Sequence, residues 1–322
     1  MTTNGDHFDP DVVKRVAIWD STDLVVDRRC ILCDYEPCRE VAVRTDGLLI
    51  RECPNCALAF VDPRPSSNQL NRYYAEGYFD GAKDFFRGKD YCLERDRSIQ
   101  AGLITGYREI VSHFKLKGKT VLDIGCASGA LLYLLREQQA KEVIGLDSAE
   151  YPVSFGIENY GLDLRSVALE SAQLPDSYFD LITLIDVIEH VENLNTFLDQ
   201  LNRVIKPGGH VFIITPNYSA YALAGRQWSC LSKDFEHLQY FCEESLHRIC
   251  SRFRWLLLKS WTDSVPFRIH EYPRLYKFGF HRLLHPSLAL RNRISENRYK
   301  RAVKKQMFAG GSLNAVLRAP LA

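Results

Sequence analysis

The stretch Val-Leu-Asp-Ile-Gly-Cys-Ala-Ser-Gly at residues 121–129 combines an acidic side chain with a glycine turn. An apolar run ends in Asp123, and a helix-like segment, 130–138, follows Gly129. This order is typical of a buried parallel strand that leads into a loop where the backbone approaches a ligand closely. The spacing is G-x-x-x-G, whereas G-x-G-x-x-G holds a pyrophosphate. The loop therefore suits a ligand without a pyrophosphate group.

A second carboxylate follows eighteen residues after Gly129. The strand-like segment 142–146 ends in Asp147. A carboxylate at the end of such a strand can accept hydrogen bonds from both hydroxyl groups of a ribose. Together the two segments predict a site for a nucleoside-containing ligand.

The cysteines near the N-terminus form two knuckles, Cys30-Ile-Leu-Cys33 and Cys53-Pro-Asn-Cys56, with nineteen residues between them. Two pairs at this separation suit a Zn²⁺ ion bound tetrahedrally by four thiolates. The intervening segment 40–51 alternates like a hairpin, with Asp46-Gly47 as its turn. These features predict a zinc ribbon within residues 28–65. A site closed by four thiolates leaves no position for a substrate, so we expect its role to be structural.

Cys38 is a fifth cysteine in the same module. It either replaces one of the four ligands or remains a free thiol, and we favour the free thiol. The alternative for the whole module is a set of buried cysteines without metal. Cysteines paired at C-x-x-C spacing beside a cofactor loop favour metal binding in a reducing compartment over a disulfide framework.

Length and composition favour a soluble enzyme with one large domain and a small module. The chain has 322 residues, of which 46% are hydrophobic and 25% charged. No apolar run approaches the roughly 20 residues that a membrane span needs. The polar, acidic start of the chain does not resemble a signal peptide. We therefore expect a cytoplasmic protein.

Further motifs follow the glycine loop in a fixed order. They are Asp147, Pro175 with Phe179-Asp180, Asp186-Val-Ile-Glu-His190, and Lys206-Pro-Gly-Gly209. In this order the motifs resemble those of class I S-adenosylmethionine-dependent methyltransferases. The alternative is a Rossmann-like fold that binds no cofactor.

Strand-like and helix-like segments alternate between residues 118 and 262, which predicts an α/β fold with a doubly wound parallel sheet. The expected strands are 119–124, 142–147, 162–167, 180–186, 210–215 and 255–261, and the expected helices are 129–139, 150–160, 193–205 and 242–252. The resemblance implies a seven-stranded Rossmann-like sheet whose last strand, here 312–318, runs antiparallel. Residues 1–27 are expected to be a lead-in, 66–117 a helical linker with helices at 67–76 and about 91–115, and 118–322 the methyltransferase domain.

The resemblance also implies roles for single residues in the cofactor site. Three residues would shape the loop under the methionine portion of the cofactor: Gly125, Cys126 and Gly129. Asp123 would order that loop or meet the cofactor's amino group, and Asp147 would hold the ribose hydroxyls. Glu170 would contact the adenine amino group. Asp186 would lie beside the cofactor at the end of the fourth strand, and each of these carboxylates has a surface charge as its alternative.

Two histidines are candidates to activate an acceptor. His190 follows the fourth strand, where the transferred methyl group lies in this fold, and His237 lies in a region that forms one wall of the acceptor pocket. If their segment is helical, Asp186, Glu189 and His190 share one face. Together with His237 they resemble the metal sites of small-RNA 2′-O-methyltransferases and ubiquinone-pathway O-methyltransferases, although Asp186 stands where Glu is usual.

Three interpretations of these histidines remain open. A bound Mg²⁺ or Mn²⁺ would lower the pKa of an acceptor hydroxyl. Alternatively, His237 would act as a general base. A structural role for both histidines is the third interpretation.

Many bacterial methyltransferases of secondary metabolism and surface-glycan synthesis carry a similar N-terminal ribbon. In them the second knuckle continues into a Pro-Arg-Pro segment and a tyrosine-rich stretch, which here are 61–65 and Tyr73-Tyr74 with Tyr78-Phe79. Those relatives usually have glycine after each knuckle, whereas this chain has Asp34 and Ala57.

The segment 263–309 is an insertion before the last strand. Between Pro266 and Gln306 it holds eleven Lys or Arg and two acidic residues, a balance of +9 in a chain whose net charge is +1. Aromatic residues interleave with these charges, which suggests a lid for an anionic or nucleotide-linked small molecule. An anionic membrane surface, RNA, and a solvated helical cap that binds nothing are the alternatives.

The sequence thus predicts a methyltransferase, with O-methylation of a sugar, glycan or secondary metabolite as the leading reaction. C-methylation of a nucleotide-linked sugar is the second interpretation, and RNA methylation is the third. A non-catalytic binding module is disfavoured, because a scaffold has no need of a complete cofactor loop. The sequence leaves the oligomeric state undetermined.

Overall fold

The computed structural model describes residues 18–75, 90–100, 110, 114–225, 228–232, 234–263 and 311–321. The predicted basic insertion, apart from its first residue, lies outside the described residues, and so do Tyr78 and Phe79.

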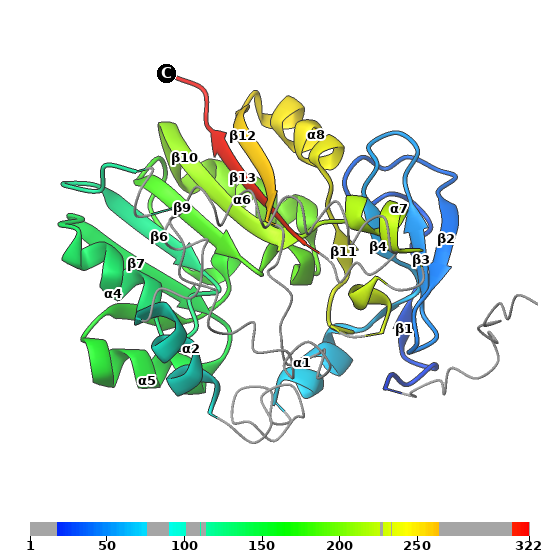
Figure 1. Cartoon of the computed structure of the whole chain (residues 1–322), viewed down its shortest axis with the longest axis horizontal. Coiled ribbons are helices and arrows are strands. Elements are labelled where there is room, and N and C mark those ends of the chain that lie inside the picture. The colour runs from blue at the N-terminus through cyan, green and yellow to red at the C-terminus, as the bar shows by residue number, and fades with distance from the viewer. Residues whose placement is uncertain are drawn as a thin grey trace, which may run out of the picture.

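A seven-stranded sheet forms the centre of the molecule (Figure 1), in the order β12-β13-β10-β9-β6-β7-β8. The parallel strands are β6 (Thr120–Ile124), β7 (Glu142–Asp147), β8 (Asp163–Ser166), β9 (Phe179–Ile185) and β10 (Ile205–Pro216). β13 (Ser312–Arg318) runs antiparallel to both β10 and β12 (Leu256–Asp263). The predicted fold class, including the antiparallel last strand, is confirmed.

Helices cover both faces of this sheet, because the central strands are apolar on both faces. α6 (Leu194–Val204) and α8 (Glu243–Phe253) pack in the core cluster on one face. α4 (Ala130–Glu137) and α5 (Glu150–Tyr160) pack on the other, and α2 (Tyr91–Gln100) contacts α4. α6 buries Leu194, Phe197, Leu198 and Leu201, the three- and four-residue spacing of one helix face.

The order of the strands reverses between β6 and β9, which makes this position a topological switch point. From β6 the chain first extends the sheet through β7 and β8, and then returns to the other side of β6 with β9 and β10. In open α/β sheets ligands bind outside the carboxyl ends of the strands at such a switch point. The loops that follow β6 and β9 leave the sheet at this position.

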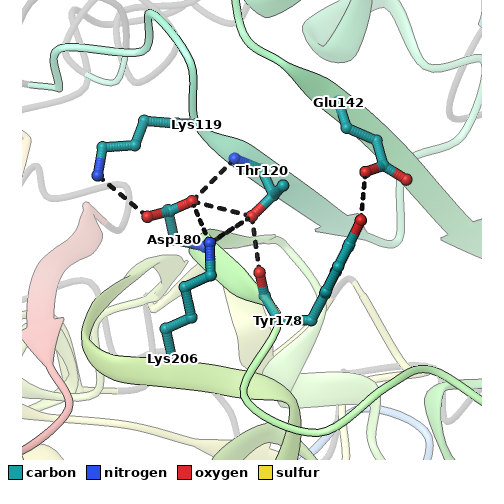
Figure 2. A network of polar contacts seen from close by, with 6 residues as sticks. All are labelled: Lys119, Thr120, Glu142, Tyr178, Asp180 and Lys206. Atoms are coloured by element: carbon teal, nitrogen blue, oxygen red, sulfur yellow. Dashed lines mark hydrogen bonds and ion pairs between the residues drawn. The ribbon is translucent and has the colours of Figure 1, made fainter.

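At the opposite ends of the parallel strands, where β6 and β9 begin, side chains form a polar network (Figure 2). The Asp180 carboxylate accepts hydrogen bonds from the Thr120 backbone N–H at 3.0 Å and from Lys206 Nζ at 2.7 Å, and Lys119 Nζ lies 3.0 Å from its other oxygen. Although burial raises it, these donors hold the pKa of Asp180 well below its usual range. The network joins the first residues of β6 and β9 to β10.

The cysteine module folds as a second sheet with the order β11-β4-β3-β2. β2 (Arg39–Val43) and β3 (Leu49–Glu52) form the predicted hairpin, and β4 (Ala59–Val61) pairs with β3. The fourth strand, β11 (Gln239–Tyr240), comes from the segment between β10 and α8 of the larger domain and pairs with β4. The cysteine module and the domain of the seven-stranded sheet are therefore joined by a shared sheet, which the sequence did not predict.

Short elements complete the fold. β1 (Leu24–Val25) pairs with β5 (Arg64–Pro65), and α1 (Ser67–Ala75) follows. The remaining elements are the 3-10 helices η2 (Leu169–Ser171), η3 (Ile188–His190) and η5 (Ser229–Leu231), and the helix α7 (Ser219–Ala224). Within the described ranges, no helix is both long and apolar enough to cross a membrane.

Most predicted element ends agree with the structure to within two residues. The exception is the strand predicted to begin at residue 210, because β10 already begins at Ile205, which pairs with Phe179 before the register shifts. The helix predicted over about 91–115 is described as α2 and at Ile110, and the residues between Gln100 and Ile110 are not described.

Candidate functional site

The loop after β6 contains three residues with left-handed backbone: Gly125 (φ 71°), Ala127 (φ 46°) and Gly129 (φ 73°). A Cβ atom at Gly125 would lie 2.3 Å from Val187 Cγ2, and one at Gly129 would lie 2.9 Å from Leu164. The sequence attributed the missing Cβ atoms to the approach of a ligand. In the structure, a Cβ atom at either glycine would collide with side chains of the protein itself. The loop packs against the segment after β9 and against β8.

Asp147 holds this loop in place. One carboxylate oxygen accepts a hydrogen bond from the Ala127 N–H at 2.9 Å, and the other accepts from the Ala149 N–H at 2.9 Å. The residue is half-buried at the carboxyl end of β7, and each of its carboxylate oxygens has a further lone pair beyond these two hydrogen bonds. This geometry fits a carboxylate that accepts hydrogen bonds from a ribose diol.

Asp123 is buried at the end of β6 and accepts a hydrogen bond from Thr183 Oγ1 at 2.5 Å. Burial raises the pKa of this carboxyl group to about 7. A buried carboxyl group with a raised pKa gains most from a nearby cation, so its environment fits the ammonium of an amino-acid moiety. The neighbouring Cys126 is also buried and contacts the Ala127 carbonyl, which makes it part of the loop's packing.

α2 contacts the other side of the loop. The buried Asp96 accepts a hydrogen bond from Ser128 Oγ at 2.8 Å and another from the Tyr160 hydroxyl. These contacts tie the linker before β6 to the loop and to α5. Sequence reasoning missed Asp96, because a single acid in a polar helix carries no pattern of its own.

Two predicted cofactor residues lie apart from these contacts. Glu170 is exposed on η2, the short helix after β8. Asp186 is exposed directly after β9, with left-handed backbone (φ 53°) and its N–H bonded to the Ile214 carbonyl. Their roles toward a cofactor stay predictions.

Three of the four residues predicted to activate an acceptor come together. Ligand atoms of Glu189, His190 and His237 all lie within 4.8 Å of one another, and the two imidazole rings are 4.6 Å apart. Asp186 is not part of this group among the described residues, and the segment from Asp186 to His190 is not the helix on which a shared face depended, so a role for Asp186 stays a prediction. Asp186 itself has left-handed backbone, and η3 begins only at Ile188.

Two buried atoms of this cluster make no hydrogen bond within the part of the chain that the structure describes. Glu189 is fully buried, and its Oε2 accepts a hydrogen bond from Thr215 Oγ1 at 3.0 Å. Glu189 Oε1 and His237 Nδ1 are buried without a partner among the described residues. A buried polar atom left unpaired costs about 1–3 kcal/mol, so these two atoms are available to a ligand or to a buried water molecule.

Burial also sets the protonation of this cluster. It raises the pKa of Glu189 well above its usual range and lowers the pKa of His190. The pKa of His237 lies well below its usual range, first because of burial and then because of His190 and Arg44. Both imidazoles are therefore neutral at neutral pH, the state needed to bind a metal ion or to accept a proton.

Helix α1 contributes two tyrosines to this cluster. The Tyr74 hydroxyl lies 2.9 Å from His190 Nδ1, and the Tyr73 hydroxyl donates to Glu236 at 3.2 Å. Glu236 is buried beside His237. The tyrosine-rich stretch after the second knuckle was the signal in the sequence that marked these residues, although it assigned them no role.

His237 also belongs to a second group. Its ligand atom lies within 4.8 Å of those of Cys230 and Asp234, in the segment between α7 and β11. The sequence did not single out Cys230 or Asp234, because their spacing matches no familiar metal motif.

The four predicted cysteine ligands form one cluster. The Sγ–Sγ distances are 3.5 Å for Cys30–Cys56 and 3.6 Å for both Cys33–Cys53 and Cys33–Cys56. Four thiolates at about 2.3 Å from a zinc ion stand about 3.8 Å apart at the corners of a tetrahedron. The sulfur atoms therefore already have nearly the spacing of a four-thiolate zinc site.

Both knuckles use the same backbone turn. The Asp34 N–H bonds to the Cys30 carbonyl and the Ala57 N–H to the Cys53 carbonyl, and both residues have left-handed backbone (φ 54° and 56°). Glycine adopts this conformation without strain, which explains its frequency at these positions in the ribbon relatives. The chain forms the same turns at some cost in strain.

Cys38 lies outside the four-cysteine cluster. Its thiol donates to the Tyr35 carbonyl at 3.4 Å, and burial raises its pKa to about 12. A thiol with this pKa stays protonated, which agrees with the favoured interpretation of a free thiol.

Known proteins share both the sequence and the fold of the chain. A profile of the methyltransferase domain family matches residues 97–256. A ubiquinone biosynthesis O-methyltransferase of Pectobacterium carotovorum is 30% identical over 190 residues, which cover 55% of this chain and 72% of that protein. The chain belongs to the class I S-adenosylmethionine-dependent methyltransferases. A mitochondrial ubiquinone biosynthesis O-methyltransferase of Dictyostelium discoideum is 33% identical over 130 residues, which cover 34% of this methyltransferase and 40% of that protein.

Solved structures agree in fold. A methyltransferase from Archaeoglobus fulgidus superposes with a TM-score of 0.50 at 20% identity, covering 77% of this chain and 99% of that one. The [4+2]-cyclase SpnF superposes with a TM-score of 0.51 at 16% identity, covering 81% and 99%. S-adenosylmethionine is the cofactor of this methyltransferase family, and the environments of Asp123 and Asp147 fit its amino group and its ribose.

Proposed function

We propose that this methyltransferase transfers the methyl group of S-adenosylmethionine to a hydroxyl group of a small molecule, at the cluster of Glu189, His190 and His237. The observation that carries the proposal is the grouping of one ligand atom each from Glu189, His190 and His237 within 4.8 Å, together with two buried atoms, Glu189 Oε1 and His237 Nδ1, that have no partner among the described residues. A hydroxyl group is a weak nucleophile, so its proton must be removed or weakened for transfer to occur.

The loop after β6 would place the cofactor for this reaction. Asp147 would accept hydrogen bonds from the ribose hydroxyls, and Asp123 would face the amino group. The segment after β9 starts at the same edge of the sheet and packs on the glycine loop through Val187. This contact brings the segment that carries Glu189 and His190 next to the loop, which supports a cluster close to the transferred methyl group, as in-line transfer needs.

A divalent cation is the ligand that fits the cluster best. One carboxylate and two neutral imidazoles can hold a divalent ion such as Mn²⁺, whereas Mg²⁺ would need most of its ligands as oxygen atoms from water and the acceptor. Such an ion would supply Lewis acidity that lowers the pKa of the acceptor hydroxyl. Glu189 would then be held ionised by the ion, while Thr215 orients its other oxygen.

His237 as a general base is the second mechanism for the same reaction. Its low pKa keeps the imidazole unprotonated, but the same low pKa makes it a weak acceptor of a proton. Its unpaired Nδ1 is better explained by a ligand than by a transient proton. The names of the relatives, which are O-methyltransferases, support oxygen as the acceptor atom in both mechanisms.

The four-cysteine cluster is proposed to bind one structural Zn²⁺. The sulfur spacing of 3.5–3.6 Å and the closed set of four ligands support this assignment. Elemental analysis of the purified chain is expected to give one zinc per molecule. Substitution of either Cys30 or Cys56 is expected to remove it. A zinc-free, folded chain would contradict the assignment.

The test of the reaction measures methyl transfer to a panel of hydroxyl compounds, with nucleotide-linked sugars and glycans first. Zinc-loaded protein stripped of other ions is expected to depend on added Mg²⁺ or Mn²⁺, and Glu189→Gln is expected to lose at least about 100-fold in kcat. Glu244→Gln, an exposed acid on α8, serves as the control. Full activity without added ions would remove the metal, and methylation at carbon or on RNA would replace the proposed reaction.

A further inference from the structure

The segment that carries His237 lies between the cysteine module and the turn after β9. On one side, the Val61 N–H donates to the Leu238 carbonyl at 2.8 Å, and β11 pairs with β4. On the other side, the Leu238 N–H donates to the Glu189 carbonyl at 2.8 Å. The backbone next to His237 thus bridges module and cluster.

The side chain of Gln239 strengthens the second side of this bridge. Its Nε2 donates to the Ile188 carbonyl at 2.6 Å and to the Val191 carbonyl at 2.9 Å. Both acceptors belong to the turn that presents Glu189 and His190. The distance between His237 and these two residues is therefore set by main-chain contacts.

Arg44 makes three hydrogen bonds from the module to this segment. This arginine in the hairpin turn is fully buried. Its Nη1 donates to the His237 carbonyl at 2.7 Å and to the Tyr240 hydroxyl at 3.2 Å, and its Nη2 donates to the Phe235 carbonyl at 2.9 Å. One guanidinium thus holds the backbone on both sides of Glu236, at Phe235 and at His237.

The charge of Arg44 is balanced inside the module. Asp46 accepts from its Nε at 3.2 Å and from its Nη2 at 2.5 Å, and Trp19 Nε1 holds the same carboxylate at 2.8 Å. A buried guanidinium is costly unless it is paired and its donors are satisfied. Here the pairing uses one edge of the fork and leaves the other for the carbonyls of the 235–237 backbone.

We propose that Arg44 is a positioning residue, through which the cysteine module sets the place of the His237 imidazole beside Glu189 and His190. The inference rests on the proposed function, because it assumes that His237 takes part in the reaction. It gives the module a role beyond its own folding: the module forms part of the wall of the active site.

The first test compares two substitutions within the module of the full-length, zinc-loaded chain. Arg44→Lys keeps the charge that pairs with Asp46 but lacks the planar fork that reaches both sides. It is expected to lower kcat by about 10- to 100-fold, because small displacements of a reacting group are costly, while zinc content and S-adenosylmethionine affinity stay unchanged. Arg51→Lys is the control, since Arg51 bonds to Asp62 and Glu40 within the module.

A double-substitution cycle separates positioning from general stability. If Arg44 acts through His237, Arg44→Lys in a His237→Gln background is expected to lower kcat by less than twofold further. Hydrogen exchange is expected to become faster at the amides of 235–240 in Arg44→Lys and to stay unchanged in Arg51→Lys. Independent, multiplicative losses would show a structural role and overturn the inference.

The same experiments distinguish the failure of this inference from the failure of the proposed function. If His237→Gln alone leaves kcat unchanged, the assignment of His237 in the reaction fails. If His237→Gln is slow but Arg44→Lys turns over at the wild-type rate, the proposed function stands and the positioning role of Arg44 is wrong.

Discussion

At the scale of single residues, carboxylates do different work in this site according to their surroundings. Asp147 is half-buried and accepts two backbone hydrogen bonds, whereas Asp123 is buried with a pKa raised to about 7. Glu189 is fully buried, with one oxygen unpaired. Their order along the sequence predicted where they would lie, and their contacts are the basis of the different roles proposed for them.

Replacement of Asp147 tests the ribose assignment. Asp147→Asn keeps the size of the side chain but leaves one acceptor oxygen, so one of the two hydrogen bonds from Ala127 and Ala149 is lost together with contacts to the ribose. Calorimetry is expected to show a loss of at least about tenfold in S-adenosylmethionine affinity. Asp163→Asn, exposed on β8, is the control. Unchanged affinity in Asp147→Asn would refute the assignment.

Asp123 predicts a pH dependence of cofactor binding. Its pKa is about 7 in the free protein because of burial. The cofactor's ammonium favours the ionised carboxylate, so binding lowers this pKa and releases a proton at pH values below about 7. Affinity is therefore expected to rise as the pH increases toward neutrality, and titrations in buffers of different ionisation enthalpy are expected to show the released proton. In Asp123→Asn both effects are expected to vanish, and their persistence would contradict the account.

The residues near the cluster mark the limit of what the sequence could reveal. The Glu-His pair after β9 and His237 were found because they follow recognisable strands. Asp186 was placed with them on helical spacing, but its backbone is left-handed, a conformation that its type and neighbours do not announce. Arg44 was missed altogether, because its partners lie in a distant segment and no local pattern links them.

At the scale of elements, the two ends of the parallel strands carry different features. The candidate site lies at their carboxyl ends, and a stabilising polar network lies at their amino ends. The glycine loop and the cluster follow the carboxyl ends of the strands. The Asp180 network with Lys119, Thr120 and Lys206 lies at the opposite ends (Figure 2). The parallel strands were predictable because each is a short apolar run between turn residues. β11 was not predictable, since two residues become a strand only through pairing with β4.

Disruption of the polar network at the amino ends of the strands is expected to lower stability without lowering the affinity for the cofactor. Asp180→Asn is expected to lower the free energy of unfolding by about 1–3 kcal/mol, because charge-assisted hydrogen bonds from two lysines are weakened. Since the pKa of Asp180 is depressed in the folded state, its contribution is fully present above the unfolded pKa of about 3.9 and is lost as the pH falls toward the folded value. Urea unfolding at neutral and acidic pH measures both effects. A large loss of cofactor affinity in this variant would contradict the expectation that the Asp180 network does not contribute to cofactor binding.

At the scale of the whole molecule, the cysteine module and the methyltransferase domain act as one unit. They share the β4–β11 pairing, and the hairpin turn reaches the segment before His237 through Arg44 and through the Thr45 N–H, which donates to the Leu231 carbonyl at 2.8 Å. The sequence predicted two neighbouring domains, because each has its own motif. The contacts between them depend on the folded arrangement, which no motif encodes.

Removal of zinc tests this unity. A strong chelator is expected to unfold residues 28–65, because a ribbon of this size buries too little apolar surface to fold alone. Since β11 loses its partner strand, hydrogen exchange is also expected to increase around His237, while β6 and β7 remain protected. Protection of 234–240 that survives complete loss of zinc would show that the two parts are independent.

The central claim is that Glu189, His190 and His237 form a site for a divalent cation beside the cofactor loop. Binding of Mn²⁺ to the zinc-loaded chain, followed by electron paramagnetic resonance with S-adenosylmethionine present, tests it without knowledge of the acceptor. We expect one bound Mn²⁺ per chain, weakened at least about tenfold by Glu189→Gln and unchanged by Glu244→Gln. No bound Mn²⁺, or binding that survives Glu189→Gln undiminished, would contradict the claim.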